Sequence, residues 1–290
     1  MHSRILILLL LLGLMSSAGL QATPLNVVFG MDRSKIDNAL AQYRIDVIRL
    51  ALEKSGEPYT FSVHTEVMNQ ARRLRFLDSG EVFNVAIQGT CPEFESRFLP
   101  VRVPIYLGLG SSYRLMLIRR SLEPRLEQVK TLDQLRQFSI GQGHAWSDNP
   151  IWRNAGFKLV ESSYRNLFGM VARGRFDMFS RGLFEAYEEQ RIFSQHYPNL
   201  TVDDALVVVY PFAIYMFVSP NAPAVHAALL KGMQIAYQDG SLQALLTQNT
   251  AVAQALQKAH LQTRTRIELP AYDMTPETLE ALRTYAFKFP

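Results

Sequence analysis

Short apolar stretches alternate with helical patterns over the first third of the chain, and this alternation restricts the possible folds more than any other feature. Residues 25–29, 59–63 and 82–88 have the composition of buried strands. Residues 43–54 carry apolar side chains at helical spacing, and residues 70–77 follow as a short basic helix. A strand–helix–strand–helix–strand order favours a largely parallel sheet with helices packed on it. We therefore expect an α/β fold.

Two extended stretches interrupt this alternation, and we interpret them as crossings between two domains. The chain would leave the first domain near residues 113–118 and return near residues 206–217. This predicts two α/β lobes joined by two crossover strands, with residues 25–110 plus 208–290 in the first lobe and residues 112–206 in the second. Three helices are expected after the second crossing, at 222–238, 241–260 and 276–285.

The first 22 residues differ from the rest of the chain. A basic start is followed by an apolar run at 5–15 and then by small residues, with Ala18 or Ala22 as the cleavage point. This pattern is typical of a secretory signal peptide and too short for a membrane span. We expect an exported, periplasmic protein. The chain's net charge of +4 is too weak to indicate a nucleic-acid or membrane partner.

The sequence contains a single cysteine, Cys91. One thiol cannot form an internal disulfide, so the fold has to rest on its apolar core, and we expect Cys91 to be a small buried residue. The chain lacks the histidine and cysteine spacing of a metal site and the GxSxG and HExxH motifs of hydrolases. We therefore expect no metal, no other cofactor and no enzymatic activity.

The stretch from Gly141 to Trp146 is the strongest local candidate for a binding site. A buried strand is expected to end at Ile140, and Gly141-Gln142-Gly143 would then form a tight turn before a helix. Such a turn exposes backbone N–H groups that suit an anion. His144 adds a titratable donor and Trp146 a flat apolar face. The alternative is an ordinary strand-to-helix turn with a surface tryptophan.

Six segments in order resemble the periplasmic solute-binding proteins of type II, in particular the amino-acid-binding class of family 3. They are YRIDVIRLALEKSG, RRLRFLDSGEVFNVAI (with Asn84 in place of the usual acid), RVPIY, FSIGQGHAW, LFGMVARGRFDMF and YQDGSLQALL. The resemblance covers roughly residues 25 to 260. It implies two lobes that close over a small ligand, which shifts the population toward the closed state.

One departure from the family pattern concerns the ligand's ammonium group. The resemblance places the acid that pairs with this group five residues after Asp177, where this chain has Gly182, next to Arg181. Because a buried ammonium without a counter-charge is costly, we expect ordinary α-amino acids to bind poorly. Glu185, about one helical turn on, is the nearest acid.

The family's carboxylate clamp has two candidates here, Arg97 downstream of the third strand and Arg114 at the start of a crossing strand. Tyr106 is either a wall of the cleft or hinge packing. Gln88 and Arg181 stand at strand ends, where open α/β sheets place ligands. The candidate ligand-binding residues are therefore Gln88, Arg97, Tyr106, Arg114, Gly143, His144, Trp146 and Arg181. Arginine side chains beside a glycine turn favour an anionic or carbonyl-rich ligand.

The resemblance implies a monomeric solute-binding protein that serves an inner-membrane ABC permease or reports to a sensor kinase or cyclase. Two alternatives stay open. One is an exported enzyme on the same fold, of the dehydratase or lyase kind, with His144 as the acid–base group. The other is an interaction module without a ligand, which an empty cleft lacking convergent polar groups would favour.

Overall fold

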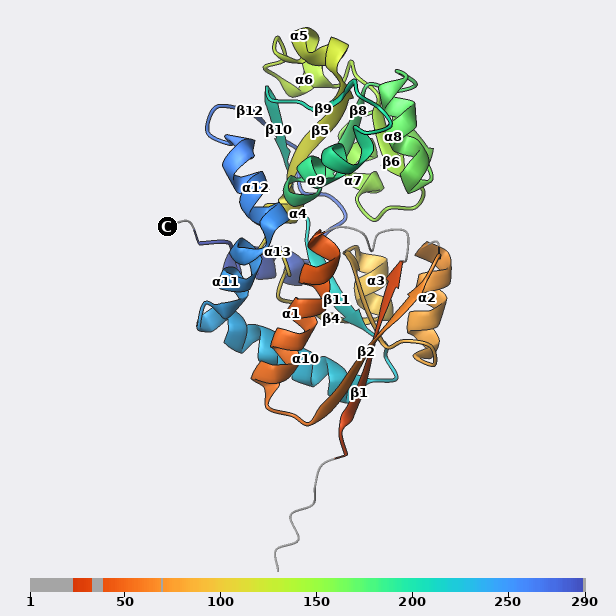
Figure 1. Ribbon diagram of the computed structural model, residues 1–290, viewed down its shortest axis with the longest axis vertical. Coiled ribbons are helices and arrows are strands. Elements are labelled where there is room, and N and C mark those ends of the chain that lie inside the picture. The colour runs from red at the N-terminus through yellow and green to blue at the C-terminus, as the bar shows by residue number, and fades with distance from the viewer. Residues whose placement is uncertain (1–22, 33–38, 69, 289–290) are drawn as a thin grey trace, which may run out of the picture.

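The computed structural model describes residues 23–32, 39–68 and 70–288, and within them the chain forms two halves, each built on its own sheet (Figure 1). The expected signal peptide at 1–22 lies outside the described residues. The first sheet has the order β2 (Tyr59–Glu66), β1 (Leu25–Asp32), β3 (Val85–Gly89), β11 (Ile214–Val218) and β4 (Leu99–Val101). β1 runs parallel to β2 and β3, whereas β11 is antiparallel to β3 and β4.

The second sheet forms the upper half of Figure 1. Its order is β12 (Thr265–Glu268), β10 (Leu206–Val209), β5 (Tyr113–Arg119), β8 (Met178–Gly182), β6 (Ile140–Gly143) and β7 (Leu159–Ser162), with β9 (Leu200–Val202) paired to β5. β6 runs parallel to β7 and β8, and β5 is antiparallel to β8 and β10. The expected α/β fold with two lobes is confirmed.

Helices cover both sheets. In the first half they are α1 (Ala39–Ser55), α2 (Gln70–Ser79), α3 (Pro92–Arg97), α10 (Pro223–Gln238), α11 (Ser241–Gln248) and α13 (Pro276–Thr284). In the second half they are α5 (Glu123–Leu126), α6 (Leu132–Leu135), α7 (Asn149–Asn154), α8 (Tyr164–Ala172), α9 (Leu183–Phe193) and α12 (Thr250–Ala259), while the short α4 (Leu109–Ser112) lies between the halves. None of the helices in the described part of the chain has the length and apolar character that a membrane span needs.

The chain crosses between the halves along two segments that lie side by side. It leaves the first sheet after β4 and returns between β10 and β11. The hydroxyls of Ser111 and Ser112 donate to the Phe212 carbonyl at 2.6 and 3.1 Å, and the Ile105 N–H donates to the Ile214 carbonyl at 3.0 Å. The strands near residues 113–118 and 206–217 were expected to cross. Within these ranges β5 and β10 lie in the second sheet and β11 lies in the first, so the crossings are the short stretches beside these strands.

Two further local expectations were wrong, and a third was confirmed. The residues from Gly141 to Gly143 are not a turn but part of the buried strand β6. The helix expected at 241–260 is broken at Asn249, whose side chain accepts hydrogen bonds from the N–H groups of Ala251 and Val252 and so starts α12. The expected burial of Cys91 is confirmed, and burial raises the pKa of its thiol to about 11.

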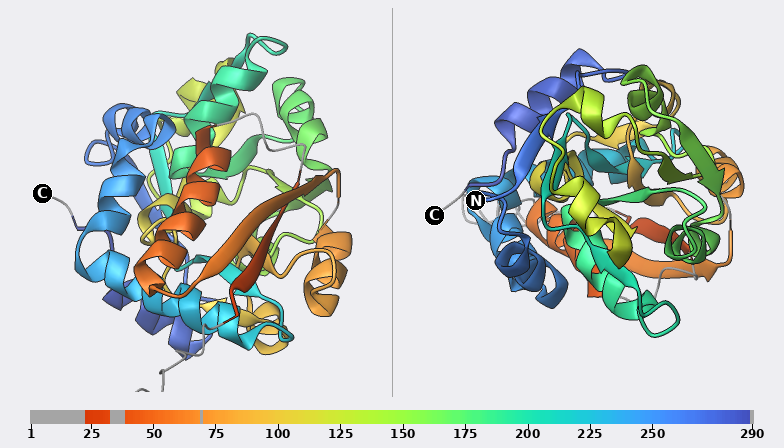
Figure 2. Two further views of the ribbon diagram at one scale, coloured as in Figure 1. Left: turned by 60° about the horizontal axis from the view of Figure 1, so that its bottom comes forward. Right: turned by 90° about the horizontal axis from the view of Figure 1, so that it is seen from above.

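The C-terminal segment serves both halves, as Figure 2 shows from two further directions. α10 and α11 pack on α1, whereas α12 packs on α9. β12 pairs with β10 in the second sheet, although we had placed residues 208–290 in the first lobe. No pattern in the short TRIE segment distinguished it from a loop. The other residue ranges that we assigned to the two lobes remain predictions.

The close packing of α1 on α10 fixes the position of the helix that reaches the site. Val47, Ile48 and Ala51 are wholly buried in this contact. A Cβ on Gly232 of α10 would lie 1.7 Å from the Ala51 carbonyl oxygen, so this position has room for no side chain. The glycine therefore lets the two helix backbones approach each other directly.

Substituting Gly232→Ala should lower the free energy of unfolding by about 1–3 kcal/mol, because the added methyl forces the two helices apart. Gln238→Ala, at the exposed end of the same helix, is the matched control and should change it by less than about 0.5 kcal/mol. Urea unfolding followed by circular dichroism measures both. Equal stability of the two variants would contradict the described packing.

Candidate ligand-binding site

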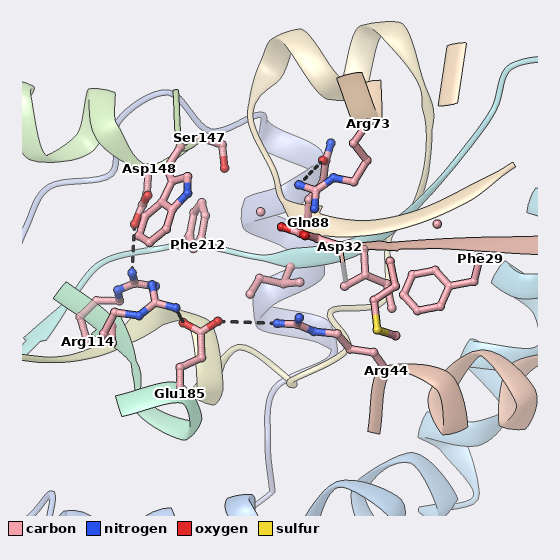
Figure 3. Close-up of a pocket in the computed structure, with 17 residues that line it drawn as sticks. Phe29, Asp32, Arg44, Arg73, Gln88, Arg114, Ser147, Asp148, Glu185 and Phe212 are labelled. Carbon is pink, nitrogen blue, oxygen red and sulfur yellow. Dashed lines mark hydrogen bonds and ion pairs between the residues drawn. The ribbon is translucent and has the colours of Figure 1, made fainter. Parts of the chain in front are cut away.

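A cavity lies between the two sheets and takes residues from both halves (Figure 3). The first sheet contributes Asp32 and Gln88, from the ends of β1 and β3, and the second contributes Arg181 from the end of β8. This is the edge at which open α/β sheets hold ligands. The cavity has a volume of about 110 Å³. That space suits a small solute.

Charged side chains of both signs line this cavity. Four are arginines and three are acids, namely Arg44, Arg73, Arg114, Arg181, Asp32, Asp148 and Glu185. Those that Figure 3 labels lie on both sides of the space. Charges out of contact with water are costly unless they are paired. The pairing of each group therefore indicates what the cavity can still bind.

Arg114 is fully engaged within the second half. Its Nη2 lies 3.2 Å from Asp148 Oδ2, and its Nε donates to Ser180 Oγ at 3.1 Å. The Tyr210 hydroxyl donates to the same Asp148 oxygen at 2.8 Å. Burial raises the pKa of Tyr210 well above its ordinary value, so the phenol keeps its proton. Arg114 thus faces the cavity as one half of a closed ion pair.

Arg181 is neutralised by two carboxylates. Its Nε and Nη2 donate to Glu189 at 2.5 and 2.7 Å, and Nη2 lies 3.0 Å from Glu185 Oε2. The guanidinium also lies 4.8 Å from the centroid of the Trp146 ring. Burial by itself would lower the pKa of Arg181, but the two carboxylates outweigh burial and raise it. Arg181 is therefore a permanent cation with its charge already matched.

Arg44 joins the two halves across the cavity. Its Nη2 lies 3.6 Å from Glu185 Oε1, and its Nε donates to the Tyr106 hydroxyl at 3.1 Å. Arg44 belongs to α1 in the first half and Glu185 to α9 in the second. Tyr106 lies in the first crossing segment and stacks on Tyr43, with ring centroids 5.4 Å apart. A single carboxylate thus bonds to a guanidinium from each half.

Arg73 and Gln88 form the part of the cavity wall with unused hydrogen-bond donors. Arg73 Nη2 donates to Gln88 Oε1 at 3.3 Å. The Nε of Arg73 and the Nε2 of Gln88 are buried, and neither has a hydrogen-bond partner among the described residues. Burial, and to a lesser extent the nearby Arg44, lowers the pKa of Arg73 to about 10, because Asp32 only partly offsets them. This end of the cavity can still receive an acceptor.

Four of the candidates from the sequence line the cavity, namely Gln88, Arg114, Trp146 and Arg181. Tyr106 is buried at the hinge and reaches the site only through Arg44. Gly143 is buried under the Trp146 ring, where a Cβ would lie 2.1 Å from the ring carbon Cε2. It serves packing and is not part of the cavity wall.

Two candidates were misplaced. His144 is exposed and is not among the residues of the cavity wall. Arg97 lies on the surface of the first half, where it pairs with Asp78 through Nε and Oδ1 at 2.9 Å. Sequence reasoning missed Arg73, because α2 carries Arg72, Arg73 and Arg75 and the local pattern does not say which one faces inward.

Two donors of the expected anion-binding turn are used within the protein. The His144 N–H donates to the Ser162 carbonyl at 3.2 Å, and the Trp146 N–H donates to the Gly143 carbonyl at 3.2 Å. The segment also carries the Trp146 ring and Ser147 to the cavity. It therefore forms part of the cavity wall.

The structure gives a steric reason for the missing acid at Gly182. A Cβ at this position would lie 2.5 Å from the carbonyl oxygen of Gly110, in the helix between the halves. No side chain fits there without movement of the backbone. Glu185, one turn later, folds back so that its Oε2 accepts from the Gly182 N–H at 3.2 Å. The acid is thus present but displaced, and it is used within the protein.

Comparisons with solved structures agree with this architecture. An ancestral arginine-binding protein bound to glutamine is similar over 79% of this chain and 99% of its own, with a TM-score of 0.58 and 12% identity. The fold is that of the type II periplasmic binding proteins. No protein-family model matches the sequence, and the comparison with curated proteins gives no match.

Two other similar structures have different described roles. One is a histidine kinase sensor domain with similarity to periplasmic binding proteins, 19% identical, with a TM-score of 0.56 over 78% of this chain and 96% of its own. The other is the GluR0 ligand-binding core from Nostoc punctiforme in complex with L-glutamate, 14% identical, with a TM-score of 0.55 over 79% of this chain and 100% of its own. At these identities the likeness establishes the fold alone.

The two arginines proposed as clamps should differ sharply in their effect on stability. Arg114→Met leaves the buried Asp148 carboxylate without its counter-charge and should cost about 3–5 kcal/mol. Arg97→Met removes a surface ion pair and should cost less than about 1 kcal/mol. Thermal unfolding of both variants measures the difference. If the two variants unfold at the same temperature, Arg114 is not in the closed ion pair described here.

Proposed function

We propose that this protein binds a small anionic or carbonyl-rich solute between its two halves, as a component of ABC-type uptake or of sensing. The observation that carries the proposal is the pair of buried donors without acceptors, Arg73 Nε and Gln88 Nε2, in the wall of the cavity. A buried donor left without a partner costs about 1–3 kcal/mol. A ligand that supplies an acceptor removes this cost.

The ligand's acceptor is best supplied by a carboxylate or a similar planar anion. A guanidinium and an amide present several N–H groups in one region, and a carboxylate accepts from both at once. The lowered pKa of Arg73 supports the same conclusion, since it reflects a cation whose burial is not fully compensated. An anion beside Arg73 would supply the compensation.

Closure of the two halves follows from the same geometry. Gln88 belongs to the first sheet and Arg181 to the second, so a solute in the cavity touches both halves. A ligand that contacts both lobes favours the closed arrangement in proportion to its extra contacts there. Similar folds include amino-acid-binding proteins of ABC transporters and a kinase sensor domain, and both uses agree with such closure.

The alternatives are less well supported. His144, the acid–base candidate for an enzyme, is exposed away from the cavity wall. An interaction module without a ligand does not account for two buried donors without a partner on residues of the cavity wall. Export to the periplasm, with signal cleavage at Ala18 or Ala22, is part of the proposal and rests on the sequence of residues 1–22.

Small carboxylates should raise the melting temperature of the protein, because a ligand that binds only the folded state stabilises it by mass action. Arg73→Gln should then weaken binding of the best carboxylate by roughly tenfold to a hundredfold, the usual range for one charge-assisted hydrogen bond. Calorimetry measures the affinity. Arg97→Gln, on the surface of the same half, is the matched control and should leave it unchanged.

Two results would contradict the proposal. If no mono- or dicarboxylate shifts the melting temperature, the cavity is not a carboxylate site. If a carboxylate binds equally well to the wild type and to Arg73→Gln, the ligand does not lie against Arg73 and Gln88.

A further inference from the structure

We infer that the cavity selects carboxylates that carry no ammonium group, and that Arg181 is the residue that sets this selectivity. The inference rests on the proposed function and narrows it to a class of ligand. It runs against the described ligands of similar folds, which include arginine, glutamine and L-glutamate.

The acids of the cavity wall all have partners inside the protein. Asp148 accepts from Arg114 and from the Tyr210 hydroxyl, and Glu185 accepts from Arg181 and the Gly182 N–H. Asp32 has a partner as well. Among the described residues of the wall, the buried side-chain atoms without a hydrogen-bond partner are Arg73 Nε and Gln88 Nε2. A ligand in this cavity therefore needs hydrogen-bond acceptors. A ligand ammonium group would find no unpaired carboxylate among the described residues of the wall.

Arg181 occupies the place that a ligand cation would need. Its guanidinium lies between Glu185 and Glu189, over the ring of Trp146 in the cavity wall. Arg181 is 4% exposed, and its pKa is raised, so it keeps its charge at any physiological pH. A ligand ammonium would have to displace this cation or lie beside it, and both are unfavourable out of water.

The backbone leaves no room for an acidic side chain at position 182. Gly182 is packed against the Gly110 carbonyl oxygen, with 2.5 Å to any added Cβ, so a carboxylate cannot be placed there as the family pattern would have it. Gly182→Asp therefore does not convert the site to one for amines. Glu185 is the carboxylate that could be made available to a ligand, and in the wild-type protein it is paired with Arg181.

Pairs of ligands with the same skeleton test this inference in the wild-type protein. The probes are succinate against aspartate, 2-oxoglutarate against glutamate, and pyruvate against alanine, each measured by calorimetry. Within the pair that binds best, we expect the acid without an ammonium to bind at least about tenfold more tightly, since each carries the same carboxylate and only the ammonium lacks a partner. This comparison needs no variant.

A double variant tests the role of Arg181. Arg181→Met alone would leave Glu189 as an unpaired buried charge, so it is combined with Glu189→Gln, whose amide oxygen can still accept from the Tyr164 hydroxyl. In this variant Glu185 loses its contact to Arg181, while its 3.6 Å contact to Arg44 and its hydrogen bond from the Gly182 N–H remain. Binding of the amino acid should improve by about tenfold relative to its partner acid. Adding Glu185→Gln should abolish that gain.

The outcomes separate the inference from the proposed function. Equal wild-type affinity for the two members of a pair overturns the inference and leaves the proposed function standing. Binding of no member of any pair overturns both. A folded double variant with the same preference as the wild type, or a gain that survives Glu185→Gln, shows that Arg181 does not set the selectivity through Glu185.

Discussion

The arrangement of the site depends on one carboxylate, that of Glu185, which stands between two guanidinium groups. Arg181 reaches it from within the second half, and Arg44 reaches it from the first half across the cavity. The contacts continue through Tyr106 into the crossing segment. Buried ion pairs contribute little net stability, because desolvation offsets their attraction. Their value here is geometric, since they fix where the two halves meet.

Close backbone contacts make this arrangement possible. Gly232 lets α1 approach α10, and α1 carries Arg44 to the cavity. Gly182 lets the helix between the halves approach the end of β8, which displaces the acid to Glu185. Gly143 accepts the Trp146 ring, on which Arg181 lies. None of the three glycines lines the cavity. Each one permits a close contact that positions a charged or aromatic side chain at the cavity.

Much of the fold could be predicted from the sequence, because strand and helix periodicity is local. The parallel pairing of β1 with β2 and β3 and the placement of Gln88 and Arg181 at strand ends follow from that periodicity. β12 could not be predicted, since a four-residue edge strand has no pattern of its own. Arg73, Arg97 and His144 show the corresponding limit for the site. A sequence places a residue on an element, but the packing of that element decides which way its side chain points.

The same distinction explains why we propose the ligand class expected from the sequence on different grounds. The sequence suggested an anion from the presence of Arg114, His144 and Arg181. In the structure the two arginines are matched by Asp148, Glu185 and Glu189, and the histidine is exposed. A count of charges therefore does not establish selectivity. The proposed preference for an acceptor rests on two buried donors without a partner among the described residues, and these belong to Arg73 and Gln88.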